Sequence, residues 1–180
     1  MRHITTLALA LLLANPVLAA QSANASTPPP AAEPAPKETP AHPAIPASAA
    51  QISAPFVLKD GAISQPAQTE LQAGGKAVFT FSVPKAGNYV IHAIANAPDE
   101  DSNSYFLNID GQPEDPLMIW DLAVTNGFEE RIVSWRGSGD SSNDEFAPKI
   151  FALSGGEHKL VVIGREPGQL KSVSVRPAGK

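Results

Sequence analysis

The last long apolar pattern of the chain constrains its fold more than any other feature. Residues 149–175 divide into three short β-type runs, Lys149–Leu153, Glu157–Ile163 and Leu170–Val175. Gly155-Gly156 separates the first two runs, and Pro167-Gly168 precedes the third. Glycine supplies the positive φ of tight turns, and proline sets the φ at the start of one. The pattern therefore predicts a β-meander at the C-terminal end.

Similar runs and turns extend back through the preceding hundred residues. In Lys76–Val83 the residues Ala77, Phe79, Phe81 and Val83 alternate with Val78, Thr80 and Ser82, which predicts a strand with an aromatic core face. Further short runs follow at Asn88–Ala95, Ser104–Asp110, Ile119–Leu122 and Ile132–Trp135. Short strands separated by frequent turn signals, without a helical period, predict an all-β domain, specifically a jelly-roll β-sandwich.

The N-terminal part of the chain has two different compositions. Residues 1–20 combine Arg2 and His3, the apolar run Leu7–Leu13 and small residues up to Ala20, which predicts a cleavable signal peptide. Residues 21–55 hold 9 Pro and 11 Ala, whereas all 11 aromatic residues lie at Phe56 or later. We therefore expect a disordered Pro/Ala-rich linker over 21–55 and a folded domain over 56–180.

Composition restricts where the protein can be located and which partners it can bind. The apolar run of the signal is shorter than the roughly 20 residues that cross a bilayer, and no later stretch reaches that length. We expect a secreted or periplasmic protein without a membrane span. The chain has no cysteine, so it has no disulfide and no thiolate nucleophile, which for an exported protein favours a bacterial source. Its net charge of −5 argues against nucleic acid as a partner.

Four motifs in order carry a resemblance to a known group of proteins. They are AGNYVIHAIANAP, NSYFLNIDG, the pair Trp120-Asp121 and FALSGGEHKLVVIGRE. From about Phe79 to Val175 the chain resembles the carbohydrate-binding modules of families six and thirty-five and their galactose-binding-like and malectin-like relatives. The resemblance implies a non-catalytic jelly roll that binds sugars in loops at one end or on a sheet face. It also implies, in many members, a structural Ca²⁺ near the first strand.

The chain departs from that group at two places. Lys171 follows Leu170 where relatives often carry an aspartate, and the opening Phe56–Gly61 offers only Asp60 where ion-binding relatives have alternating glutamates. Calcium is still the one cofactor that the sequence suggests. Asp99 and Asp101 alternate in a loop as oxygen ligands of Ca²⁺ do, although the full spacing of an EF-hand is missing.

Sugar recognition requires a flat apolar surface for the ring and planar polar groups for the hydroxyls. The aromatic candidates for stacking are Tyr105, Trp120 and Trp135, and the polar candidates are Asn103, Asp121, Arg136, Arg165 and Glu166. Each has a structural alternative. A tryptophan in a short strand often belongs to the core, an asparagine before a strand often caps a turn, and adjacent Arg and Glu often pair with each other.

Two other functions compete with sugar binding by a non-catalytic module. Acidic pairs such as Glu129-Glu130 resemble the carboxylates of glycosidases, but neighbouring carboxylates in one loop are more typical of a solvated surface, so we expect no enzyme. The second alternative is an envelope structural or adhesion protein that uses the same sandwich to bind another envelope protein. Its mark would be a flat apolar face of several hundred Å².

Overall fold

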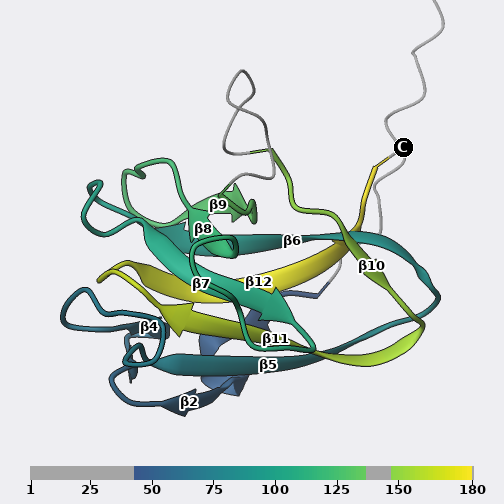
Figure 1. The fold of residues 1–180 in the computed structure, drawn as a ribbon, viewed down its shortest axis with the longest axis horizontal. Coiled ribbons are helices and arrows are strands. Elements are labelled where there is room, and N and C mark those ends of the chain that lie inside the picture. The colour runs from purple at the N-terminus through teal and green to yellow at the C-terminus, as the bar shows by residue number, and fades with distance from the viewer. Residues whose placement is uncertain (1–42, 137–146, 180) are drawn as a thin grey trace, which may run out of the picture. The chain divides into compact units, whose positions relative to one another are not determined.

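The computed structural model describes residues 43–136 and 147–179 as two antiparallel β-sheets (Figure 1). The signal peptide predicted for 1–20 and most of the predicted linker lie outside these residues. The elements are β1 (Ile45–Pro46), the 3₁₀ turn η1 (Ala47–Ala49), β2 (Gln51–Ser53), β3 (Val57–Lys59), β4 (Ala62–Ser64), β5 (Lys76–Val83), β6 (Gly87–Asn96), β7 (Ser104–Ile109), β8 (Ile119–Asp121), β9 (Glu129–Ile132), β10 (Phe151–Leu153), β11 (Gly156–Gly164) and β12 (Gln169–Pro177).

The strands divide between two layers. One sheet has the order β10-β6-β12-β4-β3, with β9 also paired to β6 and β1 also paired to β12. The other has the order β2-β5-β11-β7-β8. The all-β sandwich predicted from the sequence is confirmed. In the described residues no helix is long and apolar enough to cross a membrane.

The core lies between the two sheets, as the alternation in β5 predicts. Ala77 and Phe79 are fully buried, and Phe81 and Val83 are nearly so. On the neighbouring strand β11, Leu160 pairs with Phe79 and is also fully buried. These side chains belong to one cluster that draws residues from both sheets. Burial of this shared apolar surface is the main force that holds the layers together.

The predicted C-terminal meander is wrong, because β10, β11 and β12 are not neighbours in one sheet. β10 pairs with β6, β11 lies between β5 and β7 in the other sheet, and β12 returns to β6. The turn after β10 crosses between the layers beside the β5–β6 turn, where a Cβ on Gly155 would lie 3.2 Å from the Cα of Lys85. An alternating pattern shows which side chains face the core, but it does not choose the partner strand.

Two boundaries also differ from those expected. The folded domain begins before Phe56, because β1 pairs with β12, β2 pairs with β5, and Ala47 is fully buried in the core. The Pro/Ala-rich composition of residues 21–55 gave no sign of these two strands, since short strands need only a few apolar side chains. The strand expected at Ile132–Trp135 occurs earlier, as β9 at Glu129–Ile132.

Candidate functional site

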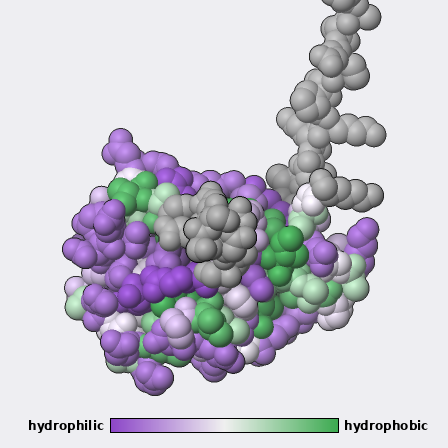
Figure 2. Space-filling view, turned by 45° about the horizontal axis from the view of Figure 1, so that its top comes forward, coloured by the Kyte–Doolittle hydropathy of each residue, from purple (hydrophilic) through white to green (hydrophobic). Residues whose placement is uncertain are grey.

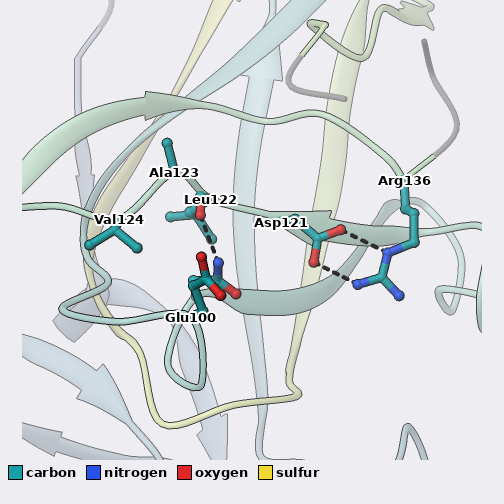
Figure 3. Close-up of a pocket in the computed structure, with 7 residues that line it drawn as sticks. Glu100, Asp121, Leu122, Ala123, Val124 and Arg136 are labelled. Atoms are coloured by element: carbon teal, nitrogen blue, oxygen red, sulfur yellow. Dashed lines mark hydrogen bonds and ion pairs between the residues drawn. The ribbon is translucent and has the colours of Figure 1, made fainter. Parts of the chain in front are cut away.

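A polar pocket of about 370 Å³ lies among the loops that connect β6 to β7 and β8 to β9 (Figure 3). Three of the predicted hydroxyl-binding residues line it, namely Asn103, Asp121 and Arg136. The remaining lining residues are Glu100, Leu122, Ala123 and Val124. Segments far apart in the sequence thus converge at one place.

Asp121 and Arg136 form an ion pair in the lining of the pocket. The backbone N–H of Arg136 donates to the carbonyl of Ile119 at 2.7 Å, which places Arg136 beside strand β8. Its guanidinium Nε and Nη2 then donate to Oδ2 and Oδ1 of Asp121, each at 2.8 Å. This two-pronged pair is directional, and the side chain of Arg136 is 45% exposed. The carboxylate keeps further lone pairs that can accept hydrogen bonds from a ligand.

Asn103 is held in place on three sides. Its backbone N–H donates to Oε2 of Glu166 at 3.1 Å, and its carbonyl accepts the N–H of Leu122 at 2.8 Å. Its side-chain Nδ2 donates to the carbonyl of Leu122 at 3.0 Å. Asn103 therefore ties the β6–β7 loop to the segment after β8, and its side chain bonds across to that segment rather than capping the turn before its own strand. It also contributes to the pocket lining.

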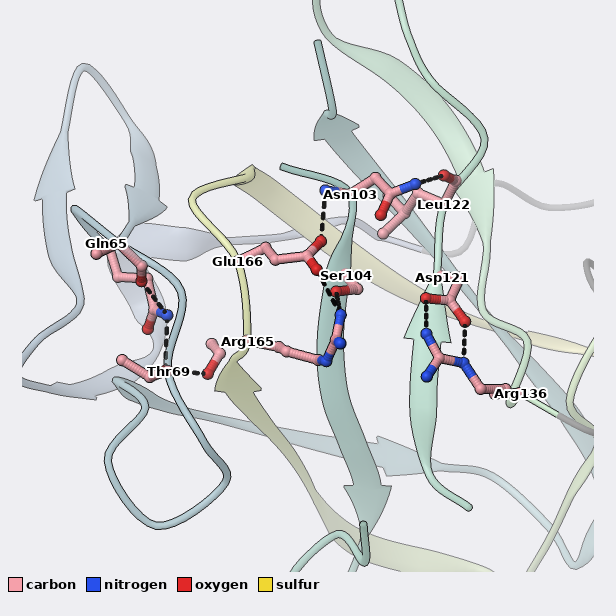
Figure 4. A network of polar contacts seen from close by, with 11 residues as sticks. Gln65, Thr69, Asn103, Ser104, Asp121, Leu122, Arg136, Arg165 and Glu166 are labelled. Atoms are coloured by element: carbon pink, nitrogen blue, oxygen red, sulfur yellow. Dashed lines mark hydrogen bonds and ion pairs between the residues drawn. The ribbon is translucent and has the colours of Figure 1, made fainter. Parts of the chain in front are cut away.

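Arg165 and Glu166 do not line the pocket, but Figure 4 shows them joined to Ser104 and Asn103. They lie in the connection between β11 and β12, where Nη1 of Arg165 donates to Oε1 of Glu166. The same nitrogen donates to Oγ of Ser104 at 2.7 Å. Glu166 is only 6% exposed. Because Glu166 accepts the Asn103 N–H, this buried pair positions the loop that carries Asn103.

Tyr105 and Trp120 lie in the core, so the expectation that they stack on a sugar is not met. They are direct partners in the β7–β8 ladder, with ring centroids 5.7 Å apart, and each is 1% exposed. Nε1 of Trp120 donates to the carbonyl of Ile132 at 3.1 Å. Burial raises the pKa of the Tyr105 hydroxyl well above its usual value, and the nearby Glu166 charge raises it further. Both rings face inward because inward positions of a sandwich demand large apolar side chains.

Trp135 lies at the margin of the core and outside the pocket lining. It is partly buried, and its Nε1 donates to the carbonyl of Leu107 at 3.0 Å. Its ring meets that of Phe151 edge-on with centroids 5.7 Å apart, and Nζ of Lys149 lies 4.0 Å from its centroid. A lysine ammonium thus lies over one face of the ring.

The calcium ligands predicted from the sequence are Asp99 and Asp101. Both side chains belong to exposed residues of the β6–β7 loop. Across residues 43–136 and 147–179 there is no group of three or more acidic or imidazole side chains that could hold a metal ion.

Sequence reasoning missed four lining residues. Glu100 lies between Asp99 and Asp101 in the β6–β7 loop. Leu122, Ala123 and Val124 follow Asp121 directly, and Val124 is 47% exposed. The exposure of Val124 is known only from the tertiary structure, so the sequence carries no signal for this wall of the pocket.

The two sheets and the loop-end pocket define a jelly-roll β-sandwich with one open, polar end. Solved structures of carbohydrate-binding modules have the same fold. A family 35 module from Clostridium thermocellum matches with a TM-score of 0.52 and 13% identity, covering 77% of this chain and 99% of that one. A family 35 module from Paenibacillus barcinonensis matches with a TM-score of 0.53 and 10% identity, covering 76% and 99%.

The third match is to part of a larger enzyme. A β-1,4-mannanase of Podospora anserina that carries a family 35 module matches with a TM-score of 0.52 and 10% identity, and 28% of that chain is covered. No protein-family model matches the sequence, and no curated protein does. The chain therefore has the fold of family 35 carbohydrate-binding modules.

Proposed function

We propose that this chain is a non-catalytic carbohydrate-binding module and that the loop-end pocket is its sugar site. One observation carries the proposal: Asn103, Asp121 and Arg136, chosen from the sequence as hydroxyl-binding residues, line the same pocket. Planar polar side chains held in fixed orientations are what pyranose hydroxyls require. The exposed Ala123 and Val124 supply apolar surface for the C–H face of the ring, in place of the aromatic platform expected.

The charges in the pocket favour a neutral sugar. Glu100 and Asp121 contribute two carboxylates, and the charge of Arg136 is already directed at Asp121. An acidic sugar would bring a third negative charge to a site with one cation. Neutral hydroxyls can donate to the carboxylates at no such electrostatic cost.

Two further features support binding without catalysis, outside the cell. A glycosidase needs two available carboxyl groups about 5–10 Å apart, and one of the two here, Asp121, is held in a bidentate pair. The signal expected at residues 1–20 would deliver the chain to the periplasm or the exterior, where polysaccharides are the main polymers.

The nearest alternative, a protein-binding envelope component, receives less support. On the face drawn in Figure 2, hydrophobic residues lie in separate groups between hydrophilic ones.

The test is a screen of the full chain against an array of neutral and acidic oligosaccharides, with calcium and again with EDTA. We expect neutral glycans to bind, and we expect EDTA to leave binding unchanged. Arg136→Lys keeps the positive charge but loses the two parallel hydrogen bonds to Asp121. Asp121→Ala removes the carboxylate that accepts those bonds. Each should weaken binding at least about tenfold, which is about 1.4 kcal/mol.

The matched control is Glu157→Ala, an exposed carboxylate on β11 outside the pocket lining. It should bind as the unaltered chain does. Near-ultraviolet circular dichroism establishes that each variant is folded. A folded chain that binds no neutral glycan, or binds one equally well without Asp121, would overturn the proposal and favour a protein partner.

A further inference from the structure

Asn126 is the one asparagine of the chain that directly precedes a glycine. Asn126 and Gly127 lie in the bend between β8 and β9, outside any strand, and both residues are exposed. Gly127 has a φ of 87°, and a Cβ placed on it would meet no atom within 4 Å. The peptide bond between the two residues therefore lies in an open turn, without a side chain on its C-terminal residue to shield it.

The side chain of Asn126 is free to rotate, whereas those of other asparagines are held. The amide nitrogens of Asn96, Asn103 and Asn108 each donate a hydrogen bond, at 2.8, 3.0 and 3.1 Å respectively. Asn88 lies within strand β6. Across residues 43–136 and 147–179, by contrast, Asn126 uses only its backbone N–H, and its side-chain amide makes no hydrogen bond. This amide can therefore turn toward the next peptide group.

An exposed and unrestrained Asn-Gly pair can react with itself. The backbone nitrogen of Gly127 attacks Cγ of Asn126, and the new C–N bond closes a five-membered imide. The bond between Cγ and Nδ2 breaks, and ammonia leaves with the proton that the glycine nitrogen gives up. Water then opens the imide. Opening at Cγ leaves aspartate, whereas opening at the main-chain carbonyl leaves isoaspartate, in which the chain runs through the side chain. Water is the one co-reactant.

We propose that Asn126 is a site of spontaneous deamidation, which converts it to aspartate or isoaspartate and adds one negative charge to the β8–β9 loop. Asparagine is among the thermolabile residues of proteins. At this position it combines an exposed side chain without a partner and a following glycine, and both lie outside the strands. The reaction does not depend on which ligand the loop-end pocket binds.

A chain of contacts connects Asn126 to one wall of the loop-end pocket. Its backbone N–H donates to Oε1 of Glu129 at 2.8 Å, and Oε2 of Glu129 lies 2.8 Å from Nη2 of Arg131. Arg131 in turn donates to the carbonyls of Ala123 and Val124, at 3.3 and 3.2 Å, and both of these residues line the pocket. Deamidation places a second carboxylate near Glu129, and isoaspartate also lengthens the backbone by one atom. Both products therefore disturb the contact from which this chain starts.

The test is incubation of the full chain at 37 °C and pH 8, followed by peptide mapping with mass spectrometry. A synthetic peptide of residues 124–128, incubated alongside, gives the rate for the unconstrained sequence. We expect Asn126 to change from amide to acid at a rate within about tenfold of that of the peptide. The rate should rise with pH, because the attacking nitrogen must lose its proton. Asn126→Gln should abolish the reaction, since the longer side chain would have to close a six-membered ring, and the matched control Asn88→Gln should leave it unchanged.

Two results would overturn the proposal. The first is an Asn126 that stays an amide in the full chain after the peptide has reacted completely. The second is equal conversion at the hydrogen-bonded Asn96, Asn103 and Asn108, which would mean general decay instead of one site.

The converted chain carries one more negative charge, so anion exchange separates it from the unconverted chain. On the glycan array the isoaspartate product should bind at least about threefold more weakly, and equal binding would refute the coupling to the pocket wall. This last readout rests on the proposed function, whereas the conversion does not. A chain that converts at Asn126 but binds no glycan would therefore sustain the modification site and refute the sugar site.

Discussion

The contact between Asp110 and His158 allows a sharp test of the electrostatics of this fold. His158 is 6% exposed, and its Nε2 lies 2.9 Å from the carbonyl of Ser154 while its Nδ1 lies 2.6 Å from Oδ2 of Asp110. Both partners are acceptors only, so both ring nitrogens must carry hydrogen, which is the cationic form. Asp110→Asn removes the negative charge and keeps the shape. Asparagine also tolerates the positive φ of 57° at this position.

The direction of the pH effect follows from two shifted pKa values. The hydrogen bond to Asp110, and then that to Ser154, raises the pKa of His158 against the effect of burial. Its stabilisation is complete below the unfolded value of about 6.5 and is lost as pH rises through the folded pKa. Burial tends to raise the pKa of Asp110, but its bonds from His158 and Lys159 lower it overall. Its contribution is complete above about pH 3.9 and is lost as pH falls through the folded pKa.

The pair therefore contributes most between about pH 4 and 6.5. A hydrogen bond to a charged group contributes about 1.5–3 kcal/mol, and Asp110 is 50% exposed, so we expect a loss of about 1–2 kcal/mol for Asp110→Asn at pH 6. For a domain of this size that lowers Tm by about 4–8 °C. At a pH above the folded pKa of His158, where the ring is neutral in both proteins, the difference should shrink to under about half of that.

The assay is urea unfolding followed by tryptophan fluorescence at pH 6, 7.5 and 9. Asp60→Asn is a matched control, because Asp60 also has a positive φ of 52° and also precedes a glycine in a turn. Asp60→Asn should change the free energy of unfolding only slightly, and by the same amount at each pH. A loss for Asp110→Asn that is the same at pH 6 and pH 9, or no loss at all, would refute the assignment of a charged pair.

Three further outcomes are expected. Tyr105→Phe should raise the free energy of unfolding by up to about 1 kcal/mol and leave sugar binding unchanged. The reason is that the buried hydroxyl of Tyr105 has no partner in the described structure. A loss above about 1 kcal/mol in thermal unfolding would contradict this. Glu166→Ala should lower the free energy of unfolding, measured in urea, by about 3 kcal/mol, because it leaves Arg165 and the Asn103 N–H without their buried partner. A loss below about 1 kcal/mol would show that solvent screens the charges of the Arg165–Glu166 pair. A chain that begins at Phe56 lacks β1 and β2 and should unfold at a lower temperature than the full chain, and equal Tm values would show that those strands add nothing.

Much of the local structure could be predicted because its causes are local. The alternation in Lys76–Val83 indicated which side chains of β5 face the core, and the structure buries Phe79 and Phe81 as expected. The positive φ of Asp110 has a local cause too, since an aspartate before a glycine readily takes it. Residue chemistry alone selected Asn103 and Asp121 for the candidate site.

The amino-acid sequence by itself determined the strand-forming runs, their core-facing side chains and the chemistry available to a site. Tertiary structure alone decided that β10, β11 and β12 alternate between two sheets, and that Trp120 fills the core instead of facing a ligand. It also decided that Arg136 lies against Asp121. The physical reason is that alternation and turn propensity act over a few residues. Strand partners and pocket walls depend on packing between residues that are distant in the sequence.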